Sequence, residues 1–434
     1  MSDAVDSRSK GTVWRRVLRV VLALLVLFCC YRLIVDAATA GLSRLYQTSA
    51  IIESRVEPAD IAVRLKPGDP EAHYTRALTL VNLERIGDAV AELREAILLR
   101  PHHYYEWLDL GVTLDRMGDQ AGAESSLRES IRLAPSFAQP RWQLGSLLYR
   151  QEKFPDAFEQ LRLGSASNPQ LIQTLIELAW TASDGKVSTL EWMVDPHSSR
   201  TDLELANFLA MQNMGEEAAR YVLKAGALVD KKDIDLSRVT IDKLLFNRQF
   251  EAAHAAWLAT HGSPKSSSTN TQGFVNGDFA DEIINNDPGF GWQLTSAPNI
   301  SAAIDPVGPG PDSRSLRIEY SGNSSPGDPV ITELLLLQSN KRYEVRFSAR
   351  TDRLVSGGPP VIVIADVGGE VSKILGQSSP LPPDTNGWTS YSVEFSTEAN
   401  TRAVSVRLVR LGCNETPCPI FGKLWLAKFA LRPI

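Results

Sequence analysis

Two cysteines near the C-terminus are the residues of this sequence best suited to a covalent reaction. Cys413 and Cys418 are separated only by the residues Asn-Glu-Thr-Pro. Two thiols on such a short loop can close a disulfide in an oxidising compartment, whereas they would stay free in a reducing cytosol. We predict the disulfide, because the export of this domain argued below leads to an oxidising compartment. Since neither a second such pair nor a histidine lies beside them, we expect no metal site.

The other reactive residue types show no catalytic arrangement. The sequence has no G-x-S-x-G or H-E-x-x-H pattern and no glycine-rich loop of the kind that holds a nucleotide. The six histidines are scattered, and the acidic pair Glu216-Glu217 fits a solvated helix face. We therefore expect a protein that is not an enzyme and needs no cofactor.

Length and charge narrow the class of protein further. The chain has 434 residues, of which 43% are hydrophobic and 22% are charged, so two or three globular domains are expected. The net charge is −6, and no long stripe of lysine and arginine is present. These features exclude a general nucleic-acid binder, which would need such a stripe to neutralise phosphates.

An apolar run at residues 17–35 predicts a transmembrane helix. As a helix it would span about 28 Å, close to the roughly 30 Å hydrocarbon core of a bilayer. Basic residues lie before or at its start, at Arg8, Lys10, Arg15, Arg16 and Arg19. Positive charge keeps that side in the cytoplasm. We predict a cytoplasmic tail at 1–16, a single pass through the cytoplasmic (inner) membrane, and a periplasmic or extracytoplasmic location for the rest.

A cleaved signal peptide is the alternative to this anchor. Residues 38–40 form an A-x-A pattern of the kind that precedes a cleavage site. Against cleavage stands the length of the segment between the apolar run and that pattern. A lipoprotein signal fits poorly, because Phe28 precedes Cys29 where a small residue is needed. Both the anchor and the cleaved peptide would export the body of the protein.

A fixed sequence period organises the middle of the chain. Prolines recur at equal intervals as Pro67, Pro101, Pro135 and Pro169. Small residues and leucines recur at the same interval as Ala89, Ala123 and Ala157, and as Leu93, Leu127 and Leu161. Together with Trp107 and the Leu-Gly pairs at 110–111 and 144–145, this pattern resembles the tetratricopeptide repeat (TPR) over residues 69–169.

The resemblance implies two antiparallel helices in each repeat. Small residues on the first helices would let the backbones approach closely, at Ala77, Gly111 and Gly145. The leucines would fill the space between helix pairs, and the proline would end the second helix. Weaker helical patterns on both sides extend the predicted α-solenoid, so we expect one helical repeat domain over residues 50–261.

Arrays of this family bind partners in a concave groove lined by the first helices. Counting along the repeat places these residues in the groove: Tyr74, Asn82, Tyr105, Asp115, Arg116, Trp142, Tyr149 and Arg150. Aromatic rings beside arginine and aspartate suit the capture of a peptide or protein. The alternative is that they are ordinary surface residues of a solenoid. The carboxylate-clamp positions of one TPR subclass are Leu78, Val112 and Ser146 here, so we expect no chaperone-tail binding.

Beyond the helical repeats the pattern changes twice. Residues 262–272 are polar and rich in serine and threonine, which predicts a linker. Over residues 273–434 short segments alternate apolar and polar residues between turns. This alternation predicts an antiparallel β-sandwich of about seven or more strands. The fold class expected for the chain is therefore α followed by β: a transmembrane helix, an α-solenoid and a sandwich.

The motifs N-G-D-F at 276–279 and G-W at 291–292, with the closing strand at 424–431, resemble carbohydrate-binding modules of the galactose-binding-like jelly-roll type. The resemblance implies sugar binding on exposed aromatic rings. Trp388 and Tyr391 are the candidate platform, whereas Trp292 and Trp425 occupy pattern positions expected in the core. The Asp-Asp pair that helps members hold calcium is replaced by Ala427 and Lys428, so we expect no calcium.

These expectations favour a non-enzymatic interaction scaffold anchored in the cell envelope. Its TPR groove would bind a protein partner of the envelope, within a polysaccharide assembly or export system. One alternative makes recognition of an envelope polysaccharide by the sandwich the main task. Another is an accessory subunit of an enzyme complex. Neither nucleic acid nor a cofactor is an expected partner.

Overall fold

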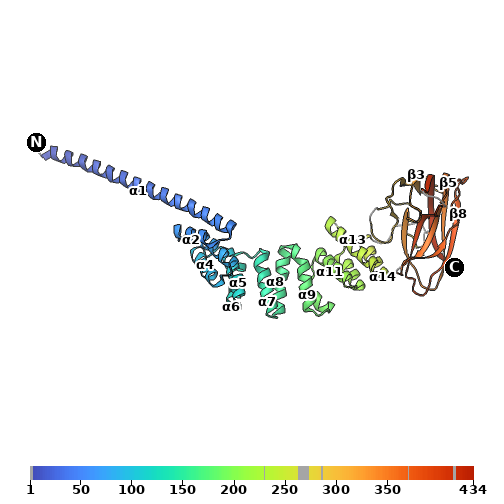
Figure 1. The fold of residues 1–434 in the computed structure, drawn as a ribbon, viewed down its shortest axis with the longest axis horizontal. Coiled ribbons are helices and arrows are strands. Elements are labelled where there is room, and N and C mark those ends of the chain that lie inside the picture. Colours follow the sequence, from blue (N-terminus) through green and yellow to red (C-terminus); the bar gives the residue numbers. More distant parts are fainter. Residues whose placement is uncertain (1–2, 229, 262–272, 285–286, 370, 414–416) are drawn as a thin grey trace. The chain divides into compact units, whose positions relative to one another are not determined.

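The computed structural model describes residues 3–228, 230–261, 273–284, 287–369, 371–413 and 417–434. Contacts divide the chain into two compact units, Met1–Asp195 and Pro196–Ile434. The predicted order of a long apolar helix, a helical stack and a domain of antiparallel sheets is confirmed (Figure 1). The linker predicted at 262–272 lies outside the described residues.

Helices make up the first unit. They are α1 (Asp3–Glu53), α2 (Val56–Leu65), α3 (Pro70–Asn82), α4 (Ile86–Leu99), α5 (Tyr104–Met117), α6 (Gln120–Leu133), α7 (Ala138–Arg150), α8 (Phe154–Ser167), α9 (Ile172–Ala182) and α10 (Val187–Val194). The starts of the pairs α3–α4, α5–α6 and α7–α8 lie one sequence period apart, as the repeat predicts. Turn chemistry separates the helices: α5 ends where Gly118 adopts a φ of +87°, and the side chain of Asp119 then caps α6.

The small residues of the period have the packing role that the resemblance implied. A Cβ atom added to Gly111 would lie 2.7 Å from Cγ of Leu127. One added to Gly145 would lie 2.7 Å from Cγ of Leu161. Since these distances are below van der Waals contact, the leucine of the second helix occupies the space that a side chain on the first helix would need.

We expect Ala123→Leu to lower the free energy of unfolding by about 1–3 kcal/mol through overpacking. Ala123 is fully buried on α6, and its carbonyl oxygen faces the backbone of Gly111. Chemical denaturation followed by circular dichroism measures the change. Ala121→Leu is the matched control, because Ala121 is exposed on the same helix. An equal effect of both substitutions would contradict the packing role of Ala123.

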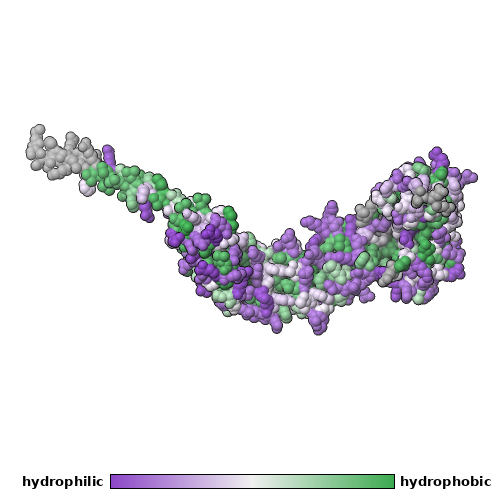
Figure 2. All heavy atoms as spheres, viewed as in Figure 1, coloured by the Kyte–Doolittle hydropathy of each residue, from purple (hydrophilic) through white to green (hydrophobic). Residues whose placement is uncertain are grey.

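The helix α1 contains the predicted transmembrane segment and continues beyond it. By length and composition it could cross a membrane, and hydrophobic side chains cover its surface there (Figure 2). Its last turns pack against α2: Ser43 Oγ donates a hydrogen bond to the Ala62 carbonyl at 3.1 Å, and Ala50 is fully buried. Ser43 precedes Ala77 by one sequence period and thus occupies the small position of a first repeat helix.

The second unit begins with helices and ends with the sheets. Its helices are α11 (Ser199–Met211), α12 (Gly215–Ala225), α13 (Lys231–Phe246) and α14 (Phe250–His261). Its strands are β1 (Gln293–Leu294), β2 (Ile300–Asp305), β3 (Ser315–Asn323), β4 (Ile331–Leu336), β5 (Arg342–Ser356), β6 (Pro360–Asp366), β7 (Lys373–Gln377), β8 (Thr389–Ser396), β9 (Ala403–Arg410) and β10 (Pro419–Pro433). Within the described residues they form two five-stranded sheets, ordered β1-β4-β9-β6-β7 and β2-β3-β10-β5-β8. All pairs are antiparallel.

The apolar core of this domain lies between the sheets. Trp292 is buried there, with its ring 4.8 Å from that of Phe429. The prediction that Trp425 is also a core residue is wrong. Leu424 and Leu426 point inward along β10, so Trp425 between them faces outward, where its Nε1 donates to Asp305 at 3.0 Å.

A loop of the sheet domain also contacts the helices of the second unit. Asp287, which is buried, accepts a hydrogen bond from Trp257 Nε1 at 3.2 Å and forms an ion pair with His261 Nε2 at 3.1 Å. The ring of Phe290 lies 4.7 Å from that of His254. The interaction with the Asp287 carboxylate, which accepts from the imidazole, raises the pKa of His261. The sheet domain is thus attached to α14 by packing and by an ion pair as well as by the chain.

Candidate functional site

The predicted groove residues lie on three successive first helices. Tyr74 and Asn82 are on α3, Tyr105, Asp115 and Arg116 are on α5, and Trp142, Tyr149 and Arg150 are on α7. Their surroundings differ, however, and the set separates into residues that join neighbouring helices and residues that are open to solvent.

Tyr74 joins α3 to α5. Its hydroxyl donates a hydrogen bond to Asp109 Oδ2 at 2.6 Å. Burial, with this hydrogen bond, raises the pKa of Tyr74, and burial also raises the pKa of the Asp109 carboxyl. Because both polar groups are half-buried and paired, Tyr74 holds two helices together and is not a free ring for a ligand.

Asp115, Arg150 and Tyr149 have the same kind of role between later helices. Arg150 on α7 forms an ion pair with Asp115 on α5. The Tyr149 ring packs edge-on against Phe158, with 6.0 Å between ring centroids. These three side chains thus connect or pack helices within the stack. Within the described residues, no such tie involves the other four predicted groove residues: Asn82, Tyr105 and Arg116 are exposed, and Trp142 is half-buried.

Tyr105 belongs to an exposed aromatic cluster. Its side chain is 42% exposed, and it stacks on Tyr104 with 4.1 Å between ring centroids. The Tyr104 ring lies 4.8 Å from that of Phe137, which is also exposed. We call Tyr104, Tyr105 and Phe137 the aromatic cluster. The groove prediction missed Tyr104 and Phe137, although the run of aromatic residues at 103–105 and the recurrence of an aromatic residue at 137 were visible signals.

A buried ionic network holds the loop before this cluster. The Glu106 side chain is fully buried and accepts a hydrogen bond from Arg100 Nε at 2.9 Å. Arg100 also pairs with Glu71 at 3.1 Å, and His103 pairs with the other carboxylate oxygen of Glu106. Since Glu106 is adjacent to Tyr105 on α5, this network fixes the turn from which the aromatic rings project.

The two candidate sugar-platform residues are not brought together. Tyr391 on β8 stacks on Phe347 at 5.4 Å and lines a cleft of about 980 Å³ over β5, β8 and β10. Trp388 is half-buried just before β8 and does not line that cleft. Charged residues of both signs surround the cleft: Asp278, Asp312, Arg314, Glu344, Arg346, Lys428 and Arg432. Such a lining can hydrogen-bond polar ligands, and the half-buried ring of Tyr391 forms part of it.

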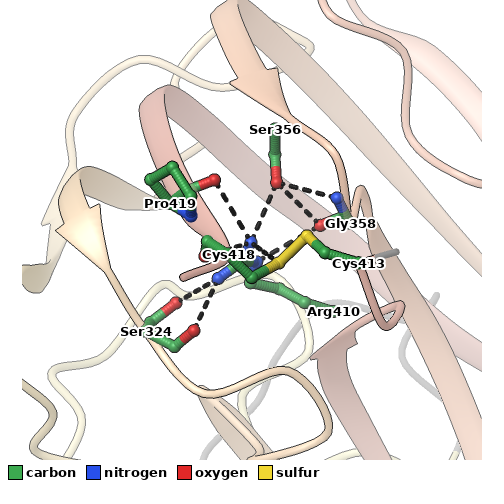
Figure 3. The surroundings of a disulfide bond; sticks show 7 residues. All are labelled: Ser324, Ser356, Gly358, Arg410, Cys413, Cys418 and Pro419. Carbon is green, nitrogen blue, oxygen red and sulfur yellow. Dashed lines mark hydrogen bonds between the residues drawn. A yellow bond between two sulfur atoms is a disulfide. The ribbon is translucent and has the colours of Figure 1, made fainter. Parts of the chain in front are cut away.

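The disulfide predicted between Cys413 and Cys418 is present (Figure 3). Beside it lies the buried guanidinium group of Arg410, which the sequence did not single out. Its donors reach the carbonyl oxygens of Ser324 at 2.8 Å, Gly358 at 3.2 Å and Cys418 at 3.0 Å. Burial lowers the pKa of Arg410. The arginine and the disulfide together fix the crossing from β9 into β10.

Replacing both cysteines by serine is expected to lower the free energy of unfolding by no more than about 3 kcal/mol, because the closed loop is short. Folding should persist, since Arg410 still holds the Cys418 backbone. Thermal denaturation measures the loss. Mass spectrometry of non-reduced peptides from native membranes tests the compartment, and two alkylatable thiols there would contradict an exported location.

Comparison with known proteins agrees with the repeat architecture. The tetratricopeptide repeat profile matches residues 70–103 and 107–137. A TPR repeat-containing protein of Pseudomonas aeruginosa is 37% identical over 97 residues, which are 22% of this chain and 40% of that protein. This chain thus matches less than half the length of that relative. These two matches show that the chain carries tetratricopeptide repeats.

Several solved structures are similar to part of this chain. MamA from Desulfovibrio magneticus is 20% identical, covers 36% of this chain and 94% of its own, and has a TM-score of 0.32. YrrB, described as a TPR protein with an unusual peptide-binding site, is 15% identical and covers 48% of this chain and 90% of its own, with a TM-score of 0.28. PilF of Pseudomonas aeruginosa is 17% identical and covers 52% and 90%, with a TM-score of 0.30. No functional conclusion follows from likeness at this level.

Proposed function

We propose that this TPR-containing chain is a non-enzymatic scaffold of the cell envelope whose first unit binds a protein partner. The partner-binding residues are those of the predicted groove that do not join helices, namely Asn82, Tyr105, Arg116 and the half-buried Trp142, extended by the aromatic cluster. Other groove residues form contacts between helices, and these contacts hold the first helices in the positions that the surface requires. These residues are Tyr74, Asp115, Tyr149 and Arg150.

The observation that carries this proposal is the exposure of Tyr105 within the aromatic cluster. Tyrosine, tryptophan and arginine dominate the energetics of protein interfaces, because they combine apolar area with a polar group. Here stacked rings are held at the start of α5 by the buried Glu106 network. A ring that is already ordered loses little side-chain entropy on binding, which favours its use as an anchor.

We expect the double variant Tyr105→Ala/Trp142→Ala to lose partner capture while its helicity stays unchanged. Full-length protein carrying a photo-crosslinking residue at Arg116 would be irradiated in cells, and the cross-linked partner identified and quantified. Trp192→Ala is the matched control, because Trp192 is an exposed ring on α10 outside the predicted groove. Equal cross-linking in all variants, or unfolding of the double variant as severe as that of Ala123→Leu, would contradict the proposed surface.

The anchoring in the inner membrane, with the body outside the cytoplasm, is part of the same proposal. Two observations support retention of α1 over cleavage after Ala40. The helix is unbroken across residues 38–40, and Asp36 before that pattern forms an ion pair with Lys66 of the repeat unit. This pair lowers the pKa of the Asp36 carboxyl. We also keep the predicted domain bounds, 50–261 and 273–434, as working limits of the repeat and jelly-roll-like domains.

Glycan recognition is the second candidate function, and the cleft at Tyr391 favours it. A partly exposed ring beside several charged hydrogen-bonding side chains is suited to the faces and hydroxyl groups of a sugar. A glycan array probed with Tyr391→Ala and with the intact chain separates the two proposals. If the intact chain binds a glycan and Tyr391→Ala does not, glycan recognition by the sandwich is supported. If the intact chain binds no glycan, this second candidate function is contradicted.

A further inference from the structure

We propose that the part of α1 beyond the bilayer is a self-association surface whose partner is α1 of a second copy of this chain. The inference rests on the proposed membrane anchoring and goes beyond it, because it assigns an oligomeric role to the helix that joins the membrane to the repeats.

The surface is a row of side chains along one side of α1. Its members are spaced alternately three and four residues apart: Val35, Ala38, Leu42, Leu45, Ser49 and Ile52. The large apolar members Val35, Leu42, Leu45 and Ile52 are all exposed. A spacing that alternates between three and four is the a/d pattern along which two helices supercoil. We call this row the α1 seam.

Packing inside the unit leaves the seam uncovered. Ser43, Gln47 and Ala50 are the buried residues of this part of α1, and they face α2 and the turn before α3. At about 100° per residue, the side that they form lies nearly opposite the α1 seam. The helix therefore has two packing sides beyond the membrane, and the repeats occupy only one of them.

Lipid does not account for the exposed seam. If residues 17–35 fill the hydrocarbon core, the helix from Val35 to Ile52 projects about 26 Å farther. The headgroup region on one side of a bilayer is only about 5–8 Å thick. Asp36, whose side chain is 71% exposed, forms an ion pair with Lys66 at the start of this projection. Leu42, Leu45 and Ile52 consequently face an aqueous compartment.

A second copy is the occupant that fits these constraints. Two chains anchored in the same orientation hold their α1 helices parallel and at the same height, so identical seams meet in register. The helix charges beyond the membrane, Asp36, Arg44 and Glu53, lie off the seam positions, although Glu53 accepts a hydrogen bond from Ser49, so no seam position carries a charge that would repel the same residue of the second copy. A helix already held in the bilayer also loses less freedom on pairing than one from solution.

Cysteine cross-linking in native membranes tests the inference. The full-length chain would carry Cys29→Ser and Cys30→Ser, since both cysteines are exposed on α1, while Cys413 and Cys418 stay paired. Oxidation should convert most of the Leu45→Cys and Ile52→Cys variants into disulfide-linked dimers. Ile51→Cys is the matched control: Ile51 is the same residue type, 60% exposed against 77% for Ile52, but lies off the seam. Equal dimer formation at Ile51, or none at any position, would overturn the proposal.

A second variant tests the α1 seam independently of the membrane anchoring. Leu42→Glu/Leu45→Glu should abolish the cross-link at Ile52→Cys through charge repulsion, with membrane retention and helicity unchanged because both leucines are exposed. A cross-link that persists in this variant would overturn the seam. The same membrane samples are also washed with carbonate, and the fraction of the chain that stays with the membrane is measured. Release from the membrane with seam-specific dimers intact would overturn the anchor alone, and release without dimers would overturn both.

Discussion

Arg410→Met is expected to lower the free energy of unfolding of the sheet domain by about 3–5 kcal/mol, the range found when one partner of a buried charged interaction is removed. The guanidinium group is buried and donates to four backbone carbonyl oxygens, those of Ser324, Gly358, Cys418 and Pro419, as well as to the hydroxyl groups of Ser324 and Ser356. Methionine fills similar volume but donates nothing. The carbonyl oxygens would lose this donor, and each one left buried without another partner costs about 1–3 kcal/mol.

Denaturation of the intact chain, followed by the fluorescence of tryptophans such as the buried Trp292, measures this loss. Arg410→Lys distinguishes charge from geometry, because a lysine keeps the charge but lacks the planar guanidinium group that reaches all of these acceptors at once. We expect it to recover little of the stability. Arg353→Met is the control for an exposed arginine of the same domain and should change the free energy of unfolding by less than about 0.5 kcal/mol. A similar loss in both methionine variants would refute the role given to Arg410.

The stability of the sheet domain is expected to fall as the pH rises from acid through neutral, and Glu333→Gln is expected to remove most of that fall. Glu333 on β4 is fully buried, and one carboxyl oxygen accepts a hydrogen bond from the Val275 amide. Among the described residues its other oxygen has no hydrogen-bond partner. Burial raises the pKa of Glu333 well above its usual range, although the Val275 hydrogen bond opposes the shift.

The sign follows from proton linkage. A carboxyl whose pKa is higher in the folded state holds its proton there at pH values where the unfolded chain has released it. The stabilisation is therefore complete below the unfolded pKa of about 4.3 and is lost as the pH rises through the folded value. Glutamine keeps the acceptor and cannot ionise. Thermal denaturation at a series of pH values tests this, with Glu394→Gln as control, since Glu394 is exposed on β8. A glutamine variant at 333 with the original pH slope would contradict the assignment.

The elements of this protein were predictable because they depend on local spacing. A proline in each sequence period ends the second helix, and the small residues at positions such as Gly111 are read directly from the period. Alternating apolar residues predict strands for the same reason, since side chains of a strand point to opposite faces. The short loop between Cys413 and Cys418 likewise allowed the disulfide to be predicted.

The open part of the candidate site could not be predicted, because the contacts that remove residues from it join positions about one repeat apart. Tyr74 meets Asp109, and Asp115 meets Arg150, only after consecutive helix pairs have stacked. Periodicity indicates which side of a helix faces the groove. It does not indicate which polar groups on that side have already found partners on the next helix.

The sequence by itself determined that this chain has an apolar helix, tetratricopeptide repeats and a two-sheet domain. The tertiary structure alone decided that α1 serves both as the long apolar helix and as the first helix of a repeat, with Ser43 in the small position against α2. Only the tertiary structure revealed that the loop residue Asp287 contacts α14 and that Arg410 lies beside the disulfide. These last two side chains act on groups far away in the chain, and the free energy of burying a charge depends on how many partners the fold assembles around it.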